Sequence, residues 1–193
     1  MDATPLKVVG IAGSLRQGSY NRGLIRAAVD LVPAGMRLRT HDLGDLPLFN
    51  ADVEARGDPD PVRRLKAAIG AADALLIATP EYNRCVPGVL KNAIDWASRP
   101  PRQSVLTNKP VAIIGASTGG GGTARAQAHL RDGLGYTNGL VLPQPEVLVP
   151  FAASRFDEAG DLHDQQTKDA IRDLLVALAE WVRQLREGLG RAA

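Results

Sequence analysis

Residues 6–31, LKVVGIAGSLRQGSYNRGLIRAAVDL, contain a pattern that the rest of the chain repeats. Leu6–Ala12 is a short apolar run, rich in β-branched residues, that ends at Gly13, and such a run predicts a buried strand. A polar loop follows, and apolar residues then recur at helical spacing at Leu24, Ile25, Ala28, Val29 and Leu31. The stretch therefore predicts a strand, a loop and a helix.

Similar runs alternate along the remaining chain. Further strands are expected at 36–41, 74–79, 111–116 and 140–149, and helices at about 60–71, 87–98, 122–133 and 165–188. Continuous apolar strands alternating with helices indicate a parallel sheet with helices on both faces. We expect an α/β three-layer sandwich with a five-stranded parallel sheet of order 2-1-3-4-5. Ligands then bind beyond the carboxyl ends of the strands, at the loops 13–21, 80–88 and 116–123.

The composition is that of one soluble globular domain. The chain has 193 residues, 45% of them hydrophobic and 23% charged, so we expect a single domain over 1–193. The formal charge is +2 and the basic residues are scattered, which argues against nucleic-acid binding. The first residues do not resemble a secretory leader, no apolar stretch has the length of a membrane span, and Cys85 is the only cysteine. These features predict a cytoplasmic protein with no membrane partner.

The first loop is rich in hydroxyl, amide and guanidinium donors. It precedes a helix N-terminus, whose free N–H groups carry partial positive charge. Ser14, Arg16, Ser19 and Asn21, together with these amides, are suited to a phosphate. Alternatively, Ser19 and Asn21 cap the helix and Arg16 stays in solvent. The lysine of a triphosphate-binding loop is absent, because Ser19 and Tyr20 stand where Lys and Ser/Thr are required, so a static monophosphate anchor is favoured.

The second loop, Pro80–Gly88, follows the third expected strand and is stiffened by two prolines. Pro87 suits the first turn of the next helix. The residues before it offer free backbone amides and the flat faces and polar tips of Tyr82 and Asn83. This loop therefore predicts a platform for a planar heterocycle.

Three segments together resemble one family. They are GSLRQGSYNRGLIRAA at 13–28, PEYNRCVPGVLKNAIDWASRP at 80–100, and the loop of Ser117 and Gly119–Gly122. These segments are similar to those of the NADPH-dependent FMN reductases and NAD(P)H quinone reductases, flavodoxin-like proteins with chromate- and azo-reductase relatives. The resemblance implies that the first loop holds the FMN phosphate, the second the isoalloxazine edge, and the third the other side of the ring. The residues then expected to bind FMN are Ser14, Arg16, Ser19, Tyr20, Asn21, Pro80, Glu81, Tyr82, Asn83, Ser117, Gly119 and Gly120.

The resemblance also implies the activity. Hydride passes from NADPH or NADH through bound FMN to a small acceptor such as a quinone, in a ping-pong cycle that needs no catalytic side chain. Many relatives are homodimers or homotetramers, and we expect the same here. Two other classes stay open: a flavodoxin-type single-electron carrier, against which the low net charge argues, and a non-catalytic nucleotide-sensing module.

Several reactive residues are interpreted individually. Arg84 departs from the family, whose members commonly carry an aromatic or small residue there, so we expect it to influence acceptor choice. Cys85 has no histidine nearby in sequence and is expected to pack behind the second loop rather than react. His41, His129 and His163 show no metal-ligand spacing, and no metal is expected.

Two features suggest a functional role that we do not expect them to have. Glu81 is expected to contribute its backbone, with a structural side chain, rather than act as a general base. Gly119-x-Gly121-x-x-Ala124 imitates a dinucleotide fingerprint, but too few residues follow it for such a domain. We expect its glycines to let the backbone approach the flavin closely.

The surface of the expected helix at 87–98 has two notable features. Lys91, Asp95 and Arg99 stand at four-residue spacing, which predicts an ion-pair ladder or an interface. Trp96 is expected to be exposed and to contact a partner subunit. Residues 50–61, with their Asp, Gly and Pro content, are expected to form a long exposed loop that acts as a lid or an interface arm.

Overall fold

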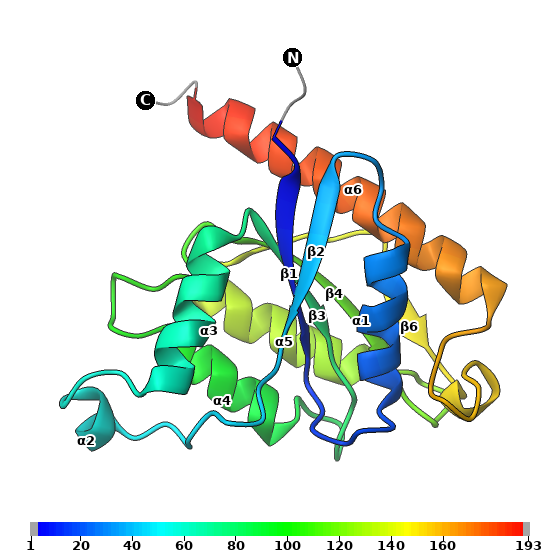
Figure 1. Ribbon diagram of the computed structural model, residues 1–193, viewed down its shortest axis with the longest axis horizontal. Helices are drawn as coiled ribbons and strands as arrows, with labels where there is room; N and C mark the ends of the chain where they lie inside the picture. Colours follow the sequence, from blue (N-terminus) through cyan, green and yellow to red (C-terminus); the bar gives the residue numbers. More distant parts are fainter. Residues whose placement is uncertain (1–3, 191–193) are drawn as a thin grey trace.

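The computed structural model describes residues 4–190, in which strands and helices alternate (Figure 1). The strands are β1 (Leu6–Ala12), β2 (Met36–His41), β3 (Ala74–Ala78), β4 (Pro110–Ala116), β5 (Leu140–Val141) and β6 (Val147–Val149). The helices are α1 (Tyr20–Asp30), α2 (Ala51–Glu54), α3 (Asp60–Ala71), α4 (Gly88–Ala97), α5 (Ala124–Tyr136) and α6 (Gln165–Gly190), with a short 3-10 turn η1 (Ala152–Ser154). The predicted alternation is confirmed, and most elements lie close to their expected places.

The sheet is parallel and has the strand order β2-β1-β3-β4-β5, with β6 also paired to β4. In β1, Val8 pairs with Leu38 on one side and with Ala74 on the other. The predicted doubly wound order is therefore confirmed. In this order the carboxyl ends of β1, β3 and β4 lie at one edge of the sheet.

Helices cover both faces of the sheet (Figure 1). α1 and α6 pack on one face in a core that contains Val8, and α3, α4 and α5 pack on the other in a core that contains Val9. Successive residues of a strand point to opposite faces, which is why these two neighbours belong to different cores. The expected three-layer sandwich is confirmed. Among residues 4–190, none of the helices is both long enough and apolar enough to cross a membrane.

The fifth strand differs from the expectation of one strand over 140–149. It consists of two short strands, β5 and β6, which pair with the beginning and the end of β4 respectively. Pro143 and Pro145 lie between them, and proline has no N–H group to donate to a sheet. The interruption still brings Val149 of β6 beside Ala116, where the third loop begins.

The segment expected to be an exposed loop at 50–61 contains a helix, α2, and the beginning of α3. Glu54 of α2 forms an ion pair of 2.9 Å with Arg99, just past the end of α4. The predicted ladder on α4 is therefore wrong for Arg99. Its other pair does form, with 2.6 Å between Lys91 and Asp95.

Trp96 is fully buried, so the expectation of an exposed tryptophan is wrong. The segment before α2 folds over α4 and covers it. The indole N–H donates to the Pro47 carbonyl at 2.8 Å, and the Phe49 ring meets the indole edge-on with centroids 5.0 Å apart. Asn92 holds the same segment, because its side chain bonds the backbone of both Pro47 and Phe49. The apolar spacing of a helix cannot predict that Trp96 is covered, because Pro47, which covers it, lies 49 positions away in the sequence.

Candidate functional site

A pocket of about 250 Å³ lies beyond the carboxyl ends of β1, β3 and β4. Its walls are the three loops expected from the strand order. The pocket is lined by Ser14, Arg16, Ser19, Tyr20, Asn21, Pro80, Glu81, Tyr82, Ala116, Ser117 and Thr118. Most predicted site residues are thus brought together, whereas Asn83, Gly119 and Gly120 lie outside this lining. Ala116 and Thr118 were missed, and their places beside Ser117 were the available signal.

The first loop presents a row of free N–H groups at the start of α1. Ser19 is the N-cap, and its hydroxyl accepts the N–H of Asn21 at 3.2 Å. Within residues 4–190, the backbone N–H groups of residues 14–18 and of Tyr20 donate no hydrogen bond. Arg16 adds a guanidinium, which lies 5.4 Å from the centre of the Tyr20 ring. Free amides at a helix N-terminus, with a cation beside them, are suited to an anion.

Asn21 fastens the first loop to the third. Its side-chain N–H donates to the Ala116 carbonyl and its side-chain oxygen accepts the Ala116 N–H, both at 2.9 Å. Both polar atoms of this buried side chain are therefore engaged by the end of β4. A contact between Asn21 and a bound phosphate stays a prediction, and the side chain already has a positioning role.

The second loop turns back on itself at Asn83 and Arg84. Tyr82 and Cys85 exchange backbone hydrogen bonds of 3.1 and 2.9 Å across this turn. Asn83 and Arg84 have φ angles of +51° and +63°, as in a type I′ turn, which is an uncommon conformation for an arginine. Tyr82 is half-exposed, and its hydroxyl lies 3.4 Å from Ser14 Oγ of the first loop. The turn thus holds an aromatic face at the pocket and Arg84 at its tip.

The third loop packs against an aromatic ring that the sequence analysis missed. Phe151 follows β6, has a φ of +49° and is 58% exposed. Its N–H donates to the Gly119 carbonyl at 3.3 Å, and a Cβ atom at Gly120 would lie 3.0 Å from its ring. Glycine at this position therefore lets the ring lie against the loop. The signal available in the sequence was an aromatic residue directly after the last apolar run.

Comparison with known proteins assigns this architecture to a family. The family model of NADPH-dependent FMN reductases matches residues 6–154. The chain belongs to this family. The NAD(P)H-dependent FMN reductase of Pseudomonas aeruginosa is 52% identical over 181 residues, covering 94% of this chain and 97% of the relative. The 2-hydroxy-1,4-benzoquinone reductase of a Burkholderia species is 44% identical and covers 94% and 98%.

A solved structure supports the same assignment for this FMN reductase. FerB, a flavoenzyme NAD(P)H:(acceptor) oxidoreductase from Paracoccus denitrificans, matches the fold with a TM-score of 0.84 and 36% sequence identity. The match covers 93% of this chain and 98% of that structure. The whole sandwich is therefore shared, including the edge that carries the pocket.

The pocket of the FMN reductase has the donors and surfaces that FMN requires. A phosphate monoester needs several unpaired donors, and the pocket is lined by Ser14 and Arg16 of the first loop, whose backbone N–H groups donate no hydrogen bond within residues 4–190. A flavin ring needs a flat platform, which Pro80 and Tyr82 of the second loop provide. The lysine that would bridge further phosphates is absent from the first loop. These residues fit one phosphate and one planar ring.

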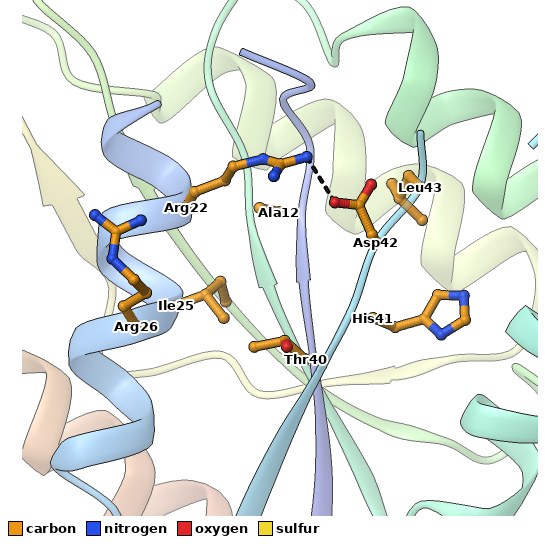
Figure 2. A pocket seen from close by; sticks show the side chains of 9 residues that line it. Ala12, Arg22, Ile25, Arg26, Thr40, His41, Asp42 and Leu43 are labelled. Carbon is orange, nitrogen blue, oxygen red and sulfur yellow. Dashed lines mark hydrogen bonds and ion pairs between the residues drawn. The ribbon is translucent and has the colours of Figure 1, made fainter. Parts of the chain in front are cut away.

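A second pocket, of about 220 Å³, lies between α1 and β2 (Figure 2). One of its lining residues, Arg22, contacts the first loop. Arg22 extends across the end of β1, where its guanidinium donates to the Asp42 carboxylate at 2.7 Å and to the Ser14 carbonyl at 3.1 Å. Arg26 forms an ion pair of 2.9 Å with Asp161. Because both arginines already pair with carboxylates, little positive charge is available in this pocket to bind an anion. Arg22 of this pocket holds the Ser14 carbonyl in place.

The sequence predicts no chemical role for His41 or Cys85 and no metal site. His41 turns its ring away from Arg22 and Arg26 (Figure 2), and burial lowers its pKa, which favours the neutral imidazole. Over residues 4–190, no three His, Cys, Asp or Glu side chains are placed to share a metal ion. Cys85 is exposed at the turn of the second loop, so the expectation that it packs behind that loop is wrong. The tight turn directs this residue outward.

Proposed function

We propose that this reductase binds FMN between its three loops and passes electrons from NADPH or NADH to small quinones. One observation carries the proposal: Ser14 and Arg16, from a stretch 14–18 whose backbone N–H groups donate no hydrogen bond within residues 4–190, line the same pocket as the half-exposed ring of Tyr82. The first feature suits the phosphate of FMN and the second suits its ring. Relatives named as an FMN reductase and a benzoquinone reductase, at 52% and 44% identity, support this chemistry.

Each wall of the pocket has a separate task in this scheme. The first loop binds the phosphate through its amides and Arg16, and the second loop orients the planar ring along Pro80 and Tyr82. Within residues 4–190, the N–H groups of Asn83 and Arg84 donate no hydrogen bond, so they are available to stabilise negative charge that develops at the ring edge. When bound, FMN would supply the redox chemistry, a two-electron transfer from the nicotinamide to the quinone.

Steady-state rates with NADPH and 1,4-benzoquinone are expected to give parallel double-reciprocal lines. The reason is that nicotinamide and quinone would occupy the same open face of the pocket in turn. The measurement follows NADPH absorbance while both substrates are varied. Intersecting lines would contradict the shared face. Failure to oxidise either nicotinamide would contradict the reductase function and favour an electron carrier.

Arg84→Ala is expected to lower kcat/KM for an anionic quinone and leave that for a neutral benzoquinone nearly unchanged. Arg84 is exposed at the tip of the second loop, and none of the ion pairs found among residues 4–190 involves its guanidinium. An exposed charge interaction is weak, so the expected loss is about two- to fivefold. The loss should shrink at high salt.

The Arg84→Lys variant is the matched control, because it keeps the charge and changes the backbone preference little. It is expected to keep the wild-type preference between the two quinones. Equal losses for both quinones in Arg84→Ala would show that Arg84 shapes the turn and does not select acceptors.

We further propose that the reductase forms a homodimer or homotetramer, as the family resemblance implies. Exposed apolar side chains, Leu15 in the first loop, Tyr82 in the second and Phe151 beside the third, support a contact on this side of the molecule. Trp96 takes no part in it, because the segment before α2 covers this residue. A cytoplasmic location stays a prediction.

A further inference from the structure

The side chain of Glu81 joins two walls of the pocket. Its oxygen Oε2 accepts the backbone N–H groups of Arg125 at 3.0 Å and Ala126 at 3.1 Å, in the first turn of α5. Its other oxygen, Oε1, lies 3.9 Å from the Arg125 guanidinium. The Glu81 side chain is 14% exposed, so water competes only weakly for these contacts.

The first turn of α5 receives no side-chain cap from the residue that precedes it. Thr123 occupies the N-cap position, but its side chain makes no hydrogen bond to the helix amides. Its buried hydroxyl instead accepts the side-chain N–H of Gln127 at 3.0 Å. The N-terminal amides of a helix need an acceptor and carry partial positive charge. Glu81 supplies both the acceptor and the opposite charge from a loop 44 positions earlier in the chain.

The location of Glu81 makes this cap important for the pocket. Glu81 lies between Pro80 and Tyr82, which form the expected ring platform, and α5 begins directly after the third loop. The carboxylate therefore links the second loop to the third. Asn21 links the first loop to the third in a similar way, through Ala116. Both ties act between loops that are far apart in the sequence.

We infer that Glu81 is a positioning residue: by capping α5 it sets the spacing between the second and third loops and pre-shapes the slot for the flavin ring. This inference rests on the proposed function, because it requires FMN to occupy this pocket. Walls that are already in place need no ordering when a ligand binds, and this raises affinity. The carboxylate touches neither cofactor nor substrate in this scheme.

The test compares Glu81→Ala and Glu81→Gln with the matched control Asp73→Asn. Asp73 also accepts a backbone N–H, that of Lys7 at 2.8 Å, and also pairs with an arginine, but it lies just before β3 at the opposite edge of the sheet. FMN dissociation constants are measured on the apoproteins by quenching of FMN fluorescence. Hydrogen exchange at the amides of Arg125 and Ala126 is measured on the same apoproteins, and thermal unfolding records any general loss of stability.

Glu81→Ala is expected to weaken FMN binding about tenfold and to speed exchange at both amides about tenfold or more, because a charge-assisted acceptor is lost. Glu81→Gln keeps an acceptor oxygen of the same reach and should recover most of the affinity. Asp73→Asn should lower the unfolding temperature while leaving FMN affinity within about twofold of wild type.

Two results would overturn the inference while the proposed function stands. The first is faster exchange in Glu81→Ala with wild-type FMN affinity, which would make the carboxylate a cap and nothing more. The second is unchanged exchange at Arg125 and Ala126, which would mean that the cap does not form in solution. A wild-type chain that fails to bind FMN would overturn the proposed function itself, and this inference with it.

Discussion

Arg16→Ala is expected to weaken FMN binding about 10- to 150-fold, since a charge-assisted contact to a phosphate contributes roughly 1.5–3 kcal/mol. Arg16 lines the pocket beside the free amides of residues 14–18. Its guanidinium lies 5.4 Å from the centre of the Tyr20 ring, so it stays close to the start of α1. The amides remain in the variant, and they should preserve weak binding.

The comparison for Arg16 is Arg84→Ala, which removes the same charge from the second loop. Its FMN dissociation constant is expected to stay within about threefold of wild type, because an exposed charge away from the phosphate interacts weakly. Both constants are measured by titrating apoprotein into FMN and following fluorescence. Equal losses in the two variants would mean that loop 13–21 does not hold the phosphate.

Gly115→Ala is expected to destabilise the protein by about 3 kcal/mol or more, an effect at the upper end of overpacking. Gly115 lies near the end of β4. A Cβ atom there would lie 2.4 Å from the Thr79 carbonyl oxygen, which belongs to the backbone and cannot turn away. It would also lie 2.1 Å from the Thr123 hydroxyl, just before α5. The variant must therefore move Thr79, just past the end of β3, and Thr123 away from β4.

The control for Gly115 is Gly70→Ala in α3, where a Cβ atom meets nothing within 4 Å. Alanine is the better helix former by roughly 0.5–1 kcal/mol, so this variant is expected to be as stable as wild type or more stable. Urea unfolding gives both free energies. A Gly115→Ala variant whose free energy of unfolding lies within about 1 kcal/mol of wild type would show that the strand ends separate easily and are not tightly packed.

Most of the fold could be predicted because its elements are encoded by residues close together in the chain. The apolar runs at β1, β3 and β4 are buried on both faces, and this burial is what makes them continuous in sequence. Because the strands alternate with helices, only a few strand orders were possible, and the observed order is the one predicted. The fifth strand was predicted wrongly because its apolar character continues through two prolines that interrupt its pairing.

The candidate site was predictable as a set of loops. In a parallel sheet the carboxyl ends of neighbouring strands meet at one edge, so loops 13–21, 80–88 and 116–123 had to converge. Their donor-rich and aromatic residues are local properties of the sequence. Phe151 was missed, because it reaches the third loop only after the interrupted fifth strand has carried the chain back to β4.

By itself, the sequence determined the order of strands and helices, the loops that form the pocket and the kind of ligand those loops suit. Only the tertiary structure decided which polar atoms of those loops already have a hydrogen-bond partner and which are available to a ligand. Asn21 bonds Ala116 across 95 positions, Glu81 caps α5 across 44, and Trp96 is covered by Pro47 across 49. Periodicity and turn signals arise from neighbours a few residues apart, whereas these partners depend on the packing of distant segments. For that reason the sequence could not show that Asn21 also links two loops, and Trp96, which was expected at the surface, is part of the core.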